Sequence, residues 1–152
     1  MIQRKQTIFL LIAVILTIVC LCLPIGSIMA ENTFGDKSVI YNLWITSADG
    51  NHSLSVWPLF AILLITCPIA LIAIFTYRNR ITQSRFCMFN MLLIVGWYVV
   101  YAMYVLNLKE AGNELTISLP VIFPATSLIL YFMARKAILA DEALVRSADR
   151  IR

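Results

Sequence analysis

The chain has 152 residues, of which 61% are hydrophobic and only 13% are charged, and its net charge is +4. In soluble domains roughly half of the residues are apolar and about a quarter are charged, so this composition excludes an ordinary soluble protein and indicates a membrane protein. The basic residues stand in short blocks beside apolar runs, where they suit anionic lipid headgroups. Because the polar segments hold no aromatic and basic platform, we expect no nucleic-acid partner.

The first apolar run covers residues 7–29 and follows two basic residues. Its onset resembles a secretory signal peptide, but it is longer than the apolar region of such a peptide, which has about 7–15 residues. We therefore expect a retained transmembrane helix, kinked or ended near Pro24 and Gly26.

The longest polar connection, residues 30–55, comes next. Apolar residues alternate along it, and Asp49-Gly50 is a strong signal for a tight turn, so we expect a small β-hairpin at the outer mouth of a helix bundle. His52, the only histidine of the chain, lies beyond the turn. One loop histidine does not make a metal site.

Three further apolar runs follow, each long enough to cross a hydrocarbon core about 30 Å thick. The sequence thus predicts an all-α membrane protein with four transmembrane helices in a single domain, 1–152. The predicted segments after the hairpin are a helix at 56–77, a cytoplasmic turn at 78–85, a helix at 86–108, an outer loop at 109–114, a helix at 115–136 and a cytoplasmic amphipathic tail helix at 137–152.

Lysine and arginine set the predicted orientation. Of the 12 such residues, ten fall on the side that holds both chain ends and the turn at 78–85, and only Lys37 and Lys109 fall on the other. Under the positive-inside rule, this asymmetry places both termini in the cytoplasm.

The first candidate site is a basic cytoplasmic surface formed by the turn and the tail helix. Its residues are Arg78, Arg80, Arg85, Arg146, Asp149, Arg150 and Arg152. We expect this surface to contact lipid headgroups or a protein partner. No glycine-rich loop of the kind that cradles phosphates accompanies the arginines.

The second candidate site is a polar and aromatic seam on the third predicted helix, made of Asn90, Trp97, Tyr101 and Tyr104. Helical spacing puts the three rings on one face. Such a face suits either a pocket for a quinone or lipid or a helix–helix seam whose phenols are hydrogen-bonded, and we favour the seam.

Neither transport nor redox chemistry is indicated. No Asp, Glu, Lys, Arg or His lies within the four apolar runs, the fourth of which covers residues 115–134 of the helix predicted at 115–136. Ion-coupled transporters place ionisable groups inside such segments. A quinone-linked thiol oxidase would carry cysteine pairs in its outer loops, but every cysteine here lies in or beside an apolar run. We predict no catalytic residue, no cofactor and no metal ligand, and therefore no enzyme.

Several segments resemble a known family. They are MIQRKQ at the start, IFTYRNR before the third helix, RFC and NMLL within it, and DE with LVRSADRIR at the end. Together they are similar to the small four-span membrane proteins of Bacteroidota that are classed as a domain of unknown function. Thr82 and Ser84 depart modestly from that pattern. The resemblance implies a bacterial inner-membrane location and supplies no activity.

We therefore expect an integral inner-membrane protein that serves as a structural or accessory subunit. Its basic face would contact membrane lipids, a protein partner or a second copy of the chain in a homo-oligomer. The alternative is a four-helix bundle that binds or transports a lipid, a quinone or another small molecule.

Overall fold

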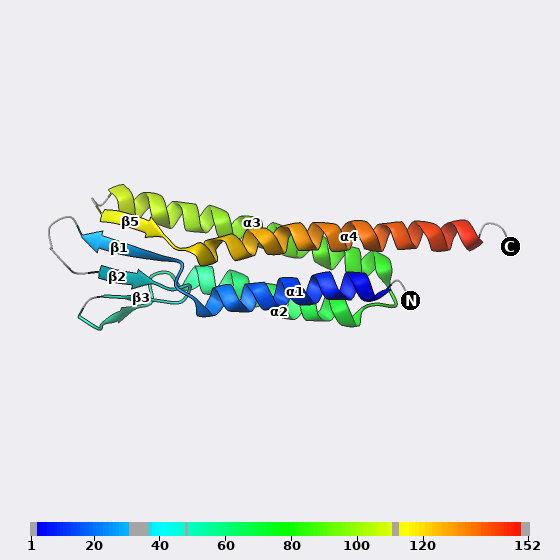
Figure 1. Cartoon of the computed structure of the whole chain (residues 1–152), viewed down its shortest axis with the longest axis horizontal. Coiled ribbons are helices and arrows are strands. Elements are labelled where there is room, and N and C mark those ends of the chain that lie inside the picture. Colours follow the sequence, from blue (N-terminus) through cyan, green and yellow to red (C-terminus); the bar gives the residue numbers. More distant parts are fainter. Residues whose placement is uncertain (1–2, 31–36, 48, 111–112, 150–152) are drawn as a thin grey trace.

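The computed structural model describes residues 3–30, 37–47, 49–110 and 113–149. Four long helices run side by side, and a small sheet lies at one end of them (Figure 1). The helices are α1 (Gln3–Cys22), α2 (Trp57–Phe75), α3 (Arg80–Glu110) and α4 (Ile122–Asp149), the last preceded by the 3₁₀ turn η1 (Leu119–Val121). Successive helices alternate in direction, α1 and α3 each pack against α2 and α4, and the arrangement is an up-and-down bundle.

The sheet closes the end where α1 and α3 finish. Its strands are β1 (Gly26–Ala30), β2 (Lys37–Ile40), β3 (Ile45–Thr46), β4 (His52–Ser53) and β5 (Asn113–Ile117). They are antiparallel in the order β4-β3-β2-β1-β5, so β1 pairs with a strand from its own connection and with one from the α3–α4 connection. The sheet therefore ties the two outer connections of the bundle together.

The mostly helical prediction is confirmed, but the all-α prediction is wrong at two places. The helix predicted at 7–29 ends at Cys22, and its last residues form β1. The helix predicted to begin at 115 is preceded by β5, and α4 starts at Ile122. A short apolar run is compatible with a helix and with a strand, because strand pairing also satisfies the backbone groups of both stretches.

Two residues explain why β1 forms where a helix was predicted. Pro24 has no N–H for a helix and restricts the residue before it, so α1 cannot continue. Gly26 faces β5, where a Cβ would lie only 3.2 Å from the carbonyl oxygen of Thr116. The missing side chain thus lets β5 approach and completes the sheet.

The predicted hairpin is present as β3 and β4, but it is one part of the larger sheet. Gly50 has a φ of 78°, a left-handed conformation that residues with a side chain adopt at a cost. Its N–H donates to the carbonyl of Ser47, and the N–H of Ser47 donates to the carbonyl of Asn51, both at 3.0 Å.

The predicted cytoplasmic turn is shorter than 78–85, because α2 ends at Phe75 and α3 begins at Arg80. Gln83 and Ser84 are consequently helical and buried. The predicted segments 115–136 and 137–152 share one continuous helix, α4, up to its last described residue.

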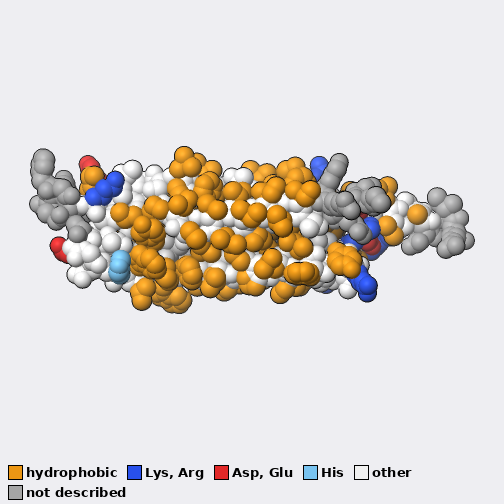
Figure 2. All heavy atoms as spheres, turned by 60° about the horizontal axis from the view of Figure 1, so that its bottom comes forward, with side chains coloured by type: hydrophobic (Ala, Val, Ile, Leu, Met, Phe, Trp, Pro, Cys, Tyr) orange, Lys and Arg blue, Asp and Glu red, His pale blue; other side chains and the backbone are white. Residues whose placement is uncertain are grey.

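The bundle is held by two buried clusters and has an apolar exterior. Alanines at helix contacts, such as Ala13, Ala70 and Ala134, let the backbones approach closely, as in membrane helix packing. Hydrophobic side chains cover the middle of the face seen in Figure 2, and charged side chains lie towards its two ends. Within the part of the chain that the structure describes, three helical stretches are long and apolar enough to cross a membrane: Trp57–Phe75, Arg80–Lys109 and Leu119–Ala148. Among the described residues of α1, Gln6–Cys22 form a shorter apolar helix.

Candidate functional site

The end of the bundle opposite the sheet gathers the predicted basic surface. The α2–α3 connection and the first turns of α3 place three arginines there, next to α4 (Figure 1). They surround an open depression of about 470 Å³, which we call the arginine depression. Its lining residues are Arg78, Asn79, Arg80, Ile81, Thr82, Arg85 and Glu142.

Asp141 fastens this end of the bundle. Nη1 of Arg80 donates a hydrogen bond to the backbone carbonyl of Asp141 at 3.0 Å, and Nε2 of Gln6 donates to its Oδ2 at 2.6 Å. One residue of α4 thus joins α1, α3 and α4. This junction was not predicted from the sequence. The carboxylate of Asp141, beside the apolar stripe of the predicted amphipathic helix, was the feature that could have indicated it.

Arg78 and Arg85 differ from Arg80, because both are exposed and neither has a hydrogen bond or ion pair within the described part of the chain. Glu142 is engaged elsewhere: its Oε1 accepts a hydrogen bond from Nε of Arg146 at 3.1 Å. The arginine depression therefore offers two guanidinium groups to an outside ligand, while the carboxylate in its lining already has a cationic partner.

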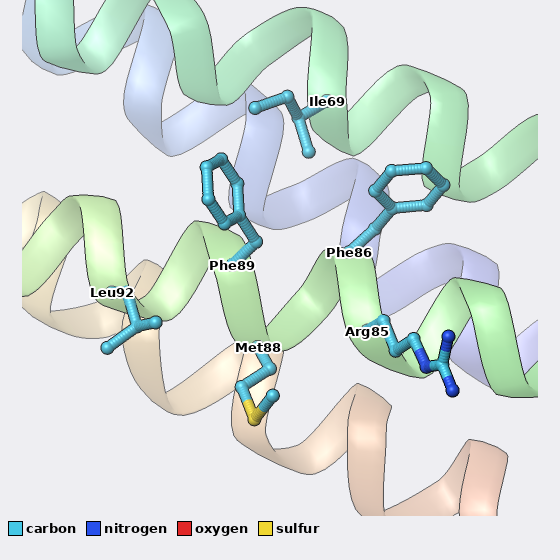
Figure 3. Close-up of a pocket in the computed structure, with 6 residues that line it drawn as sticks. All are labelled: Ile69, Arg85, Phe86, Met88, Phe89 and Leu92. Carbon is cyan, nitrogen blue, oxygen red and sulfur yellow. The ribbon is translucent and has the colours of Figure 1, made fainter.

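An apolar groove begins beside the arginine depression, and Arg85 borders both. The groove has a volume of about 530 Å³ and is lined by Ile69, Arg85, Phe86, Met88, Phe89 and Leu92. The rings of Phe86 and Phe89 come from α3 and lie on either side of Ile69 from α2, and the guanidinium of Arg85 points away from them (Figure 3). The groove was not predicted from the sequence, because its walls come from two helices.

The last turns of α4 carry two further members of the predicted basic surface, Arg146 and Asp149. Arg146 is exposed and pairs with Glu142. Arg150 and Arg152 lie outside the described residues, as does the side chain of Asp149.

The structure places Trp97 and Tyr101 together beneath the sheet, in the second candidate site. Their rings are stacked, with centroids 5.3 Å apart and planes 3° from parallel. The fully buried Trp97 donates from Nε1 to Oδ1 of Asn42 at 3.3 Å. Asn42 is also fully buried, and its Nδ2 donates to the carbonyl of Cys20 at 2.7 Å. The role of Asn42 was not predicted from the sequence. The only feature that indicated it was an amide side chain within an apolar part of the loop.

The phenols of the seam are also hydrogen-bonded. The Tyr101 hydroxyl donates to the carbonyl of Ile25 at 3.4 Å, and the Tyr104 hydroxyl donates to the carbonyl of Ser55 at 2.9 Å. Both acceptors lie in the connections that lead into and out of the sheet. The three rings of the seam therefore hold the sheet onto α3.

Asn90 lies apart from these rings, in the α3–α4 contact of the bundle core. It is fully buried beside the hydroxyl of Tyr131, and neither its amide nor that hydroxyl has a hydrogen-bond partner of good geometry among the described residues. Asn90 therefore does not belong with the three rings that hold the sheet onto α3.

The described residues contain no cluster of His, Cys, Asp or Glu that could hold a metal ion. The four cysteines are free thiols.

The chain was compared with curated proteins and with models of protein families. A search of curated proteins returns no match. The family model described as Domain of unknown function (DUF4293) matches residues 2–151, which is nearly the whole chain. The chain therefore belongs to the DUF4293 family.

Proposed function

We propose that this chain is a four-span protein of the bacterial inner membrane, with both termini in the cytoplasm, that serves as a structural or accessory subunit through its basic end. The observation that carries the proposal is the distribution of side chains along the bundle, apolar around the middle and rich in arginine at one end. An apolar surface suits lipid tails, and arginines next to it suit anionic headgroups.

The proposal counts α1 as the fourth span. Its apolar part, Gln6–Cys22, extends over about 26 Å at 1.5 Å per residue, close to the thickness of a typical hydrocarbon core. Ile8, Ile15 and Ile18 are about half exposed on its outer face. Since α1 also packs between α2 and α4, it occupies the same depth as those helices.

The orientation rests on the ten lysines and arginines that accompany the two chain ends and the α2–α3 connection, against two on the sheet side. Cysteine labelling tests it, with Thr82→Cys at the arginine end and Asp49→Cys in the hairpin, since both positions are exposed. The background is Cys22→Ala, which removes an exposed native thiol. In spheroplasts, a membrane-impermeant maleimide should label Asp49→Cys directly and Thr82→Cys only after lysis. Labelling of both from the same side would overturn the topology.

The accessory role is supported by the last turns of α4, which project beyond the other helices (Figure 1). Leu144 and Val145 are exposed there, next to the charged Arg146. A photoreactive residue at Leu144 should cross-link a discrete protein in cells, whereas one at Leu64, exposed in the middle of α2, should cross-link lipid only. If both positions recover the same lipids and no protein, the accessory role is wrong.

A second candidate function, a lipid-binding bundle, is favoured by the groove between α2 and α3. It needs no protein partner. Its separate consequence is a defined lipid ligand.

A further inference from the structure

We propose that the arginine depression and the apolar groove form one binding site for a single anionic phospholipid, with its phosphate at Arg78 and Arg85 and an acyl chain along Phe86 and Phe89. The inference rests on the proposed function only in placing the arginine end at the headgroup layer. It adds one bound anionic phospholipid per chain.

The polar half of the site contains two arginines that are available to bind an anion. Arg78 and Arg85 make neither a hydrogen bond nor an ion pair with the described residues, whereas Arg80 is held by Asp141 and Glu142 is held by Arg146. A guanidinium binds phosphate oxygens through two parallel N–H donors, which makes arginine well suited to this ligand. The pairing of Glu142 reduces its repulsion of an anion.

The apolar half of the site continues from the polar half. Its volume of about 530 Å³ is within the range of ligand sites, about 300–1,000 Å³. Phe86, Phe89 and Ile69 supply its walls, and Arg85 is its only charged lining residue among those described.

Arg85 selects the class of ligand, because it belongs to both halves. Free phosphate would leave the groove empty, and a neutral apolar molecule would leave the arginines without an anion. A phospholipid matches both halves and enters sideways from the bilayer. The hydrogen bond from Arg80 to Asp141 fixes α4 beside the arginine depression, so the polar half is shaped before the lipid arrives.

Native mass spectrometry of the full chain, extracted in mild detergent, tests the site. The probes are phosphatidylglycerol and phosphatidylcholine with identical acyl chains, and inorganic phosphate as a competitor. We expect one phosphatidylglycerol per chain to be retained at least about tenfold better than phosphatidylcholine, equivalent to about 1.4 kcal/mol. Inorganic phosphate at equal concentration should not displace it.

Two variants separate the halves of the site. Arg85→Gln should abolish the preference for phosphatidylglycerol, and Met88→Trp, which fills the groove, should weaken both lipids. The matched controls are Lys136→Gln, which removes an exposed cation that lines neither half of the site, and Val99→Trp, which enlarges an exposed residue of α3 remote from the groove; neither should change retention. Circular dichroism of each variant establishes that it is folded.

Equal retention of the two lipids, or a Lys136→Gln effect as large as that of Arg85→Gln, would overturn the proposal in favour of nonspecific boundary lipid. Displacement by inorganic phosphate, with no effect of Met88→Trp, would overturn it in favour of a phosphate site without a chain. The labelling of Thr82→Cys and Asp49→Cys is independent of these results. A failed topology and a failed lipid site are therefore distinguishable.

Discussion

Replacing Asn42 with alanine removes the amide that joins the loop to α1 and α3. Its Nδ2 donates to the Cys20 carbonyl at 2.7 Å, and its Oδ1 accepts from Nε1 of Trp97 at 3.3 Å. All of these groups lie in a fully buried environment, so the substitution leaves one donor and one acceptor unpaired. Each orphaned group costs about 1–3 kcal/mol, so we expect Asn42→Ala, which leaves two such groups, to lower the free energy of unfolding by about 2–6 kcal/mol.

The assay is equilibrium unfolding in detergent micelles, followed by circular dichroism. Asn51→Ala, at an exposed amide of the same connection, is the matched control and should change stability by less than about 0.5 kcal/mol. Trp97→Phe keeps the stacked ring but removes the N–H, so the double variant should lose about 1 kcal/mol less than the sum of the single losses. An Asn42→Ala protein as stable as the control, or strictly additive losses, would refute the reasoning.

Three further substitutions test other contacts by the same unfolding assay. Gly26→Val places a side chain against the carbonyl of Thr116, and it should cost about 1–3 kcal/mol by overpacking; unchanged stability would show that β5 does not approach so closely. Asp141→Ala leaves the Gln6 amide without its acceptor and should cost about 1–2 kcal/mol, with α1 losing hydrogen-exchange protection before the sheet does; equal loss at both ends would contradict this. Asn90→Leu should be neutral or stabilising, because the amide has no hydrogen-bond partner of good geometry to lose among the described residues, and a loss above about 2 kcal/mol would show a hidden partner.

Composition and periodicity predicted the helices well, because a long apolar run has few other ways to satisfy its backbone in a membrane. They failed at β1 and β5, where apolar residues near helix ends pair across the sheet. Pro24 and Gly26 marked the end of the first helix in the sequence. Nothing local indicated that the second partner strand would come from a connection about 90 residues later, as the pairing of Gly26 with Ile117 shows.

The candidate site, too, was predictable from the sequence only in part. The arginines of the basic surface were identifiable from charge and position alone. The groove was not, because Ile69 lies on another helix from Phe86 and Phe89, and only packing brings them together. The role of Asn42 was equally hidden, since both of its partners are more than 20 residues away in the chain.

In the proposed four-span arrangement, the whole bundle, α1 included, crosses the bilayer. A nitroxide spin label at Ile15, exposed near the middle of α1, measures this by collision with oxygen and with a water-soluble nickel complex in liposomes. We expect high oxygen and low nickel accessibility, as for a reference label at Val99 of α3, and the reverse at Thr82. Nickel accessibility at Ile15 as high as at Thr82 would contradict the four-span bundle.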